Sequence, residues 1–165
     1  MLRSWLFLST VLVGALSVGS AQATVRIERF NLQGPRALPE QTRAAVIRDY
    51  LQSWQSLRIA LEQNRSELLG PSFIGEARDK LTETIGQQAV LGIRTKYQDR
   101  AHDIQIVFYS PDGLSIELKD KVEYDVEVLD HGKVKTTQHV IARYFIVLTP
   151  AEVQWRVRVL QAVAE

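Results

Sequence analysis

The fold is decided by residues 114–128, which read LSIELKDKVEYDVEV. Every odd-numbered position in this stretch is polar, and every even-numbered position except Asp120 carries an apolar or aromatic side chain. Successive side chains of a β-strand point to opposite faces of its sheet, so the alternation predicts a long strand with one buried and one solvated face.

The sequence downstream and just upstream extends this strand into a meander. Turn-forming sequences lie at residues 110–113 (SPDG), 130–133 (DHGK) and 149–152 (TPAE), and apolar-rich segments lie between and beside them. We expect four antiparallel strands, at about residues 102–109, 114–128, 134–148 and 155–163.

Further upstream the apolar spacing changes to three and four residues. Tyr50, Trp54, Leu57 and Leu61 follow this spacing within residues 39–63, whose interior has no Gly or Pro. The pattern predicts one long amphipathic helix with Pro39 in its first turn. We also expect a second helix from about residue 72 to 85 and a short third helix from about 87 to 97.

The length of the strands predicts the shape of the domain. Strands of about 15 residues exceed the usual five or six, and a sheet that long must curl. The preceding helices are available to fill its concave side. We therefore expect an α+β cone in which three N-terminal helices pack on a strongly curved antiparallel four-stranded meander, with a pocket wherever the filling is incomplete.

Residues 1–23 have the pattern of a secretory signal peptide. Arg3 precedes an apolar stretch from Trp5 to Val18, and Ala21-Gln-Ala23 offers the small residues of a cleavage site. This stretch is shorter than the ~20 residues that span a bilayer. We expect cleavage after Ala23, which gives a secreted or periplasmic protein with no stable membrane span. In the mature chain we expect an N-terminal arm or edge strand at residues 24–36 and one domain at residues 37–165.

Composition excludes several classes of function. The chain has 165 residues, no cysteine and a formal net charge of +1. It therefore forms no disulfide or iron–sulfur cluster, and it lacks the basic stripe typical of nucleic-acid binding. There is no Gly-rich phosphate loop, and the three histidines lack zinc-motif spacing, so we expect no cofactor and no metal.

Several of these features together resemble a known superfamily. The long helix with Trp54, the helical segment from Phe73 to Ile85, the long hairpins and the closing strand with Trp155-Arg-Val157 are similar in layout to nuclear transport factor 2 like proteins, including SnoaL-like members, over roughly residues 37–163. The resemblance implies their cystatin-like cone fold. These proteins include isomerases, dehydratases, epoxide hydrolases, ligand-binding proteins and noncatalytic interaction domains, so the fold selects no function. The catalytic arrangements of the steroid isomerases and epoxide hydrolases do not match this sequence residue by residue.

Asp120 is the residue most suggestive of chemistry. An unpaired carboxylate on the apolar face of a strand is costly, so a partner or a local distortion must compensate it. A two-residue turn at His131-Gly132 places Asp120 opposite Arg143, whereas a three-residue turn places it opposite Ala142. Asp120 is then either an acid at the floor of a pocket, or the site of a strand bend or bulge that lets it reach solvent or backbone.

The remaining candidate ligand-binding residues accompany Asp120, and they are Tyr50, Trp54, Tyr124, His139, Arg143 and Tyr144. The aromatic residues either line an apolar pocket or form ordinary core. The cluster from Asp99 to Asp103, which includes His102, is interpreted as a solvated junction between helix and strand.

These observations favour an exported noncatalytic binding or interaction module with a small apolar pocket. The alternative is a small cofactor-free isomerase or hydrolase that uses Asp120 with Tyr124 or His139. Both faces of residues 140–148 carry apolar side chains, so the face that the helices leave uncovered must meet the N-terminal arm or another subunit, and we expect a homodimer through the sheet. A small apolar ligand or another protein is the other expected partner.

Overall fold

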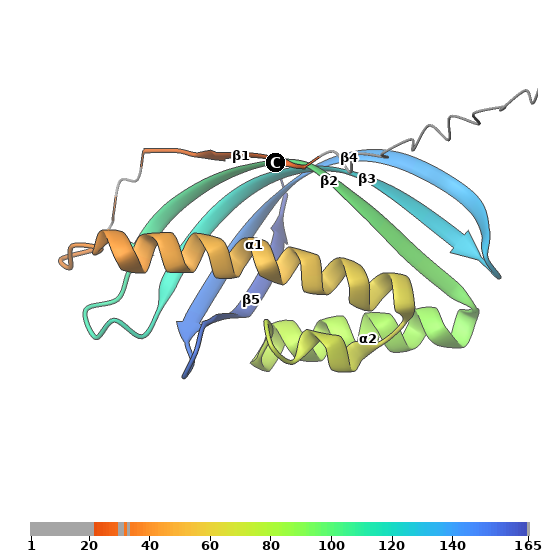
Figure 1. Cartoon of the computed structure of the whole chain (residues 1–165), viewed down its shortest axis with the longest axis horizontal. Coiled ribbons are helices and arrows are strands. Elements are labelled where there is room, and N and C mark those ends of the chain that lie inside the picture. Colours follow the sequence, from red (N-terminus) through yellow and green to blue (C-terminus); the bar gives the residue numbers. More distant parts are fainter. Residues whose placement is uncertain (1–21, 30–31, 33, 165) are drawn as a thin grey trace, which may run out of the picture.

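The computed structural model describes residues 22–29, 32 and 34–164, so the predicted leader lies outside the described residues except for Gln22 and Ala23. Helices α1 (Glu40–Gln63) and α2 (Gly75–Leu91) are linked through the short 3-10 helix η1 (Ser66–Leu69). They pack on one face of a curved sheet (Figure 1). Its strands are β1 (Thr24–Ile27), β2 (Ile93–Tyr109), β3 (Ile116–Asp130), β4 (Lys133–Pro150) and β5 (Trp155–Val163). The predicted α+β cone is confirmed.

The strands lie in the order β1-β2-β3-β4-β5. Strands β2 to β5 form the predicted antiparallel meander. Strand β1 adds a fifth, parallel strand beside β2, so the N-terminal arm is in part an edge strand. Strand β2 begins at Ile93, well before the predicted residue 102, and contains register shifts at Asp99/Ala101 and Ile106/Phe108.

The predicted third helix is wrong. Helix α2 continues through Gly86 to Leu91, and the residues from Ile93 onward belong to β2. Gly86 lies inside α2, and unlike Gly92 it is not among the glycines with a positive φ, so it does not interrupt the helix. Gly92 ends it instead, because its φ of 68° is a left-handed conformation that glycine adopts without strain.

Helix α1 lies in the concave side of the sheet (Figure 1). The face it turns to the sheet carries the residues expected from the sequence spacing, and Tyr50, Trp54, Leu57 and Leu61 are all buried. They pack with inward-facing residues of the strands, such as Ile104, Ile106, Leu118, Val122 and Ile146. The segment with helical spacing and the segments with strand spacing thus form the two layers of one core.

Polar contacts fix the helices to the sheet at both ends of the core. The buried carboxylate of Asp49 on α1 accepts a hydrogen bond from the backbone N–H of Trp155, the first residue of β5, at 2.8 Å. At the other end, the Asn64 side chain donates to the carbonyl of Ile93 at 2.7 Å. These contacts set the height of α1 along the strands and so position its side chains.

Candidate functional site

Asp120 lies on the inward face of β3, beneath α1. Its Oδ2 atom accepts a hydrogen bond from the Tyr50 hydroxyl at 2.7 Å and lies 2.7 Å from Nδ1 of His102. Tyr50 comes from α1 and His102 from β2, so three elements meet at one carboxylate oxygen. The whole residues are 0% (Tyr50), 2% (His102) and 1% (Asp120) exposed. This buried triad compensates the carboxylate that the sequence left unexplained.

The register of the β3–β4 hairpin differs from both predicted alternatives. The two-residue turn at His131-Gly132 is present, since Asp130 pairs with Lys133 and Leu129 with Val134. A shift then follows, because Val128 pairs with Thr136 and Lys135 is the extra residue. Tyr144 therefore lies opposite Asp120, where the sequence predicted Arg143 or Ala142. A β-bulge of this kind leaves no strong signal in a sequence of alternating Lys, Val and Thr.

Aromatic rings surround the triad. The Trp54 ring contacts the His102 ring at a centroid distance of 5.4 Å and the Tyr144 ring at 5.3 Å, both edge to face. The Tyr124 and Tyr144 hydroxyls lie 3.3 Å apart, and Tyr97 packs edge to face on Tyr124. We call the triad and these four aromatic residues the interior cluster. Its rings contact one another, as in a packed core.

Burial raises the pKa of three tyrosines of the interior cluster, Tyr50, Tyr97 and Tyr144. Removal from water raises the pKa of Tyr50 well above its ordinary value, and the charge of Asp120 raises it further. Burial likewise raises the pKa of Tyr97 to about 12, and that of Tyr144 is raised by burial and by the Tyr124 hydroxyl. At neutral pH these side chains are therefore hydrogen-bond donors, not bases.

Two buried polar atoms of the interior cluster have no hydrogen-bond partner among the described residues. They are Oδ1 of Asp120 and Nε1 of Trp54. An acceptor and a donor of this kind are able to bind a small polar group if the helix and sheet separate. With its triad closed, however, the side chain of Asp120 is 0% exposed.

The structure does not bring His139 and Arg143 to the interior cluster. His139 is exposed, and its Nδ1 atom lies 2.8 Å from Oδ1 of Asp125. This contact and Arg100 lower the pKa of Asp125. Arg143 lies opposite Lys121, on positions that alternate with the inward-facing Asp120 and Tyr144. Of the residues that the sequence predicted, Tyr50, Trp54, Asp120, Tyr124 and Tyr144 are together.

His102 is the member of the triad that sequence reasoning missed. The neighbouring charges of Asp99 and Asp103 predict a solvated junction at this point; Asp103 is half-buried, and its Oδ1 atom lies 3.7 Å from Nη1 of Arg26. The sequence signal for His102 is its even-numbered position along the strand. It precedes Ile104 and Ile106 at two-residue spacing, so it shares their inward face, and both isoleucines are fully buried.

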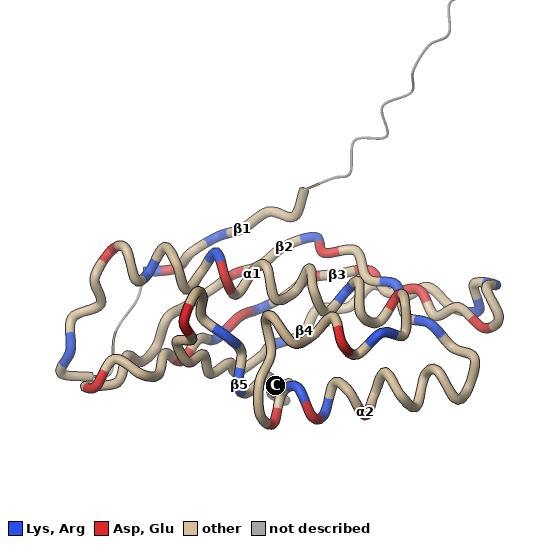
Figure 2. The backbone as a smooth tube through the Cα atoms, turned by 60° about the horizontal axis from the view of Figure 1, so that its bottom comes forward, with Lys and Arg blue, Asp and Glu red and all other residues tan. Residues whose placement is uncertain are grey.

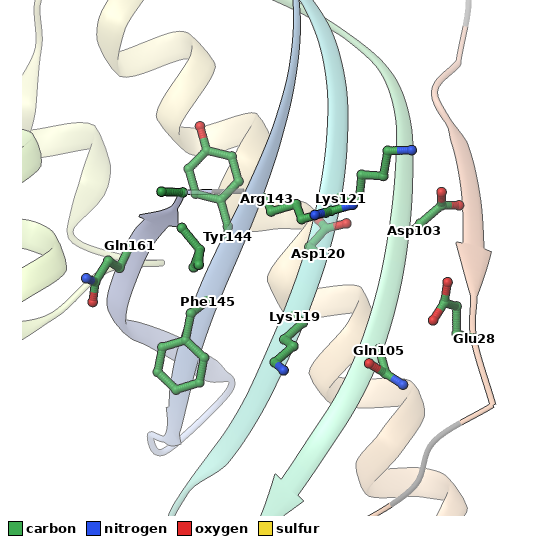
Figure 3. Close-up of a pocket in the computed structure, with 12 residues that line it drawn as sticks. Glu28, Asp103, Gln105, Lys119, Asp120, Lys121, Arg143, Tyr144, Phe145 and Gln161 are labelled. Atoms are coloured by element: carbon green, nitrogen blue, oxygen red, sulfur yellow. The ribbon is translucent and has the colours of Figure 1, made fainter.

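A groove of about 710 Å³ crosses the other face of the sheet, which points away from α1 (Figure 3). Lys119, Lys121 and Arg143 lie at its centre on β3 and β4, and Phe145 provides an apolar surface. Glu28 and Asp103 lie at one side and Gln161 at the other, as Figure 3 shows. We call this the outer groove. Elsewhere acidic and basic residues interleave along the backbone (Figure 2).

Two further kinds of site find no support in the part of the chain that the structure describes. No three His, Asp or Glu side chains among the described residues form a group that could hold a metal ion. No helix in the same part of the chain is long and apolar enough to cross a membrane.

Comparison with known proteins places the fold. No protein-family model and no curated protein sequence matches the chain. Among solved structures, the intermembrane space region of the chloroplast protein ARC6 has a TM-score of 0.65 at 14% identity and covers 79% of this chain and 100% of its own. A candidate scytalone dehydratase from Novosphingobium aromaticivorans has a TM-score of 0.53 at 16% identity, with coverage of 76% and 89%. A candidate aromatic ring hydroxylase from the same species has a TM-score of 0.51 at 12% identity, with coverage of 77% and 96%.

At these identities the likeness concerns the fold alone, and the matched proteins have different assigned roles. The likeness in fold agrees with the layout predicted from the sequence and with the observed packing of the helices in a curved sheet. The chain has the cone-shaped fold of the nuclear transport factor 2 like superfamily.

Proposed function

We propose that this chain is a noncatalytic binding module and that the outer groove is its binding surface. The observation that carries the proposal is the closed interior cluster. A general acid or base must contact its substrate, directly or through one water. Here the Asp120 side chain is 0% exposed, and one of its oxygens already binds Tyr50 and His102. Asp120 then serves to hold α1 against β2 and β3.

The charges of the outer groove indicate what it binds. Lys121 and Arg143 lie directly opposite each other on neighbouring strands, and Lys119 lies two residues from Lys121. Lys121 also lies opposite Asp103 of β2, which offsets part of this like-charge contact, and the three basic side chains together still attract an anion. The ring of Phe145 beside them suits an apolar group. The ligand class is therefore an organic anion, such as a carboxylate attached to an apolar body, or an equivalent side chain of a protein partner.

A fluorescent probe with this chemistry tests the proposal. The probe is 8-anilinonaphthalene-1-sulfonate, which combines a sulfonate with aromatic rings. We expect it to bind and Lys121→Gln to weaken binding by about fivefold, as for loss of one exposed ion pair. Lys80→Gln, which removes an exposed lysine on α2, is the matched control and should leave binding unchanged. Equal binding by both variants rejects the outer groove.

A second candidate function is a cofactor-free enzyme that uses the interior cluster. The Oδ1 atom of Asp120 favours it, because a buried acceptor without a partner among the described residues suits a polar substrate group. In this function His102 accepts a proton from the substrate and Asp120 stabilises the resulting imidazolium, so His102 replaces the predicted His139. The function requires α1 to move away from the sheet. Fast hydrogen exchange at the Trp54 indole N–H would support that motion, and slow exchange would oppose it.

Export remains part of the proposal. The N-terminal pattern ending at Ala21-Gln-Ala23 motivates it, and Thr24 begins β1. Intact-mass measurement of the protein from its native host should give a chain that starts at Thr24. A soluble chain that retains Met1 would contradict export through this leader.

A further inference from the structure

Strand β4 is longer than the strand beside it. Strand β5 pairs with β4 only from Arg143 to Pro150, whereas β4 begins at Lys133. Among the described residues, positions 133–142 therefore pair with β3 on one side, except for Lys135 at the bulge, and with no strand on the other. Half of the backbone N–H and C=O groups of this segment point out of the sheet. We call residues 133–142 the open edge.

Parts of the other edges of the sheet are covered or carry charge. Strand β1 covers residues 101–104 of β2. Beside β5, the segment from Ser72 to Ile74 exchanges backbone hydrogen bonds with Val157 at 2.8 and 3.0 Å. Strand β1 leaves residues 93–100 and 105–109 of β2 unpaired, and residues 93–100 have charged side chains at half of their positions, which are Arg94, Lys96, Asp99 and Arg100. Charged side chains at an edge deter strand addition.

The open edge lacks this protection in its middle. Residues 136–142 read TTQHVIA, with β-branched residues and no Pro, Asp, Glu, Lys or Arg. Their side chains are exposed or half-buried, and Ile141 is 56% exposed. A regular edge strand of this composition is a template for another strand.

The charges around the open edge select the incoming strand. Lys133 and Lys135 lie at one end and Arg143 at the other, and β4 contains no Asp or Glu. Antiparallel pairing of two copies about the middle of the edge places the lysines of one copy beside Arg143 of the other, which is unfavourable. Lys135 also forms an ion pair with Asp130. The carboxylates of β3 lie about 10 Å from an added strand, because β4 lies between them, so they repel an acidic segment less than the basic residues of β4 attract it.

We propose that the open edge binds an extended acidic segment of a partner protein, which adds to β4 as the next strand of the sheet. Main-chain hydrogen bonds along residues 136–142 hold the segment in place. Its acidic side chains lie beside Lys133, Lys135 and Arg143, and its apolar side chains lie beside Val140 and Ile141. The bound segment lies along the strand edge and shares only Arg143 with the outer groove.

Amide hydrogen exchange resolved by residue tests the proposal with the full chain. In the free protein, alternate amides of residues 136–141 should exchange rapidly, and those between them slowly, because adjacent residues point to opposite edges. The probe is a ten-residue peptide of alternating Thr and Val with two Glu at each end. Its addition should slow the rapid amides. The same peptide with Lys in place of Glu is the control and should leave them unchanged.

Two double variants locate the binding. Lys133→Glu with Lys135→Glu should weaken binding of the acidic peptide by about tenfold, the effect expected for reversing two surface charges near a partner. Lys119→Glu with Lys121→Glu makes the same charge change in the outer groove and should alter the peptide affinity less than twofold. Protection that lacks the two-residue period, equal binding of both peptides, or a larger loss in the outer-groove variant would overturn the proposal.

Discussion

Asp120→Leu measures how much the buried triad contributes to the fold. The change removes the acceptor of two buried donors, the Tyr50 hydroxyl and Nδ1 of His102. Each buried donor left without a partner costs about 1–3 kcal/mol, and removal of the desolvated carboxylate returns part of this. We expect the free energy of unfolding to fall by about 2–4 kcal/mol, a large share of the 5–15 kcal/mol of a typical domain. The melting temperature should fall by about 5–15 °C.

Urea denaturation at pH 7, followed by circular dichroism, provides the assay, and a double-mutant cycle with Tyr50→Phe isolates the direct contact. We expect a coupling energy of about 1 kcal/mol or more between Asp120→Leu and Tyr50→Phe, because the two residues share one hydrogen bond. Asp120→Asn is the matched control, since its amide oxygen still accepts from Tyr50, and it should lose less stability. An Asp120→Leu protein within 0.5 kcal/mol of the wild type, or more stable than it, would refute a structural role for the triad.

Three further expectations follow from the contacts and from the sequence. Asp49→Ala removes the acceptor of the Trp155 backbone N–H and should cost about 1–3 kcal/mol in a urea melt, whereas Asp49→Asn should cost less. The pKa of Tyr97 rises from an ordinary 10.0 to about 12 in the folded protein, so the unfolded chain ionises first and the free energy of unfolding falls as the pH rises from 10 to 12. Tyr97→Phe should make this fall shallower in urea melts across that pH range, and an unchanged slope would contradict the shift. The apolar residues on both faces of β4 predict a homodimer through the sheet, which light scattering at micromolar concentration should detect and a monomer mass would reject.

The sequence predicted the architecture well because the strong patterns are local. Alternation through residues 114–128 identified β3, and the three- and four-residue spacing around Trp54 identified α1. The failed third helix had the opposite cause. Gly86 and Gly92 each predict either the end of a helix or a glycine within it. Only the left-handed conformation of Gly92 shows that the helix ends there.

The interior cluster was predicted in part, because parity identifies a face but not a partner. Asp120, Tyr124 and Tyr144 follow the inward parity of their strands, and Tyr50 and Trp54 follow the inner stripe of α1. Their meeting depends on the bulge at Lys135, which shifts β4 by one residue relative to β3. His102 was missed because three neighbouring charges suggested a solvated junction, although Ile104 and Ile106 carried the stronger signal.

Chemical-shift mapping of 8-anilinonaphthalene-1-sulfonate on the isotope-labelled protein tests most directly whether the outer groove, and not the interior, binds. We expect shifts at Lys119, Lys121, Phe145 and Gln161, with the side-chain signals of Trp54 and His102 unmoved. Shifts centred on Trp54, His102 and Tyr144, with the outer groove unchanged, would show that the interior cluster opens to ligands and would contradict the proposed function.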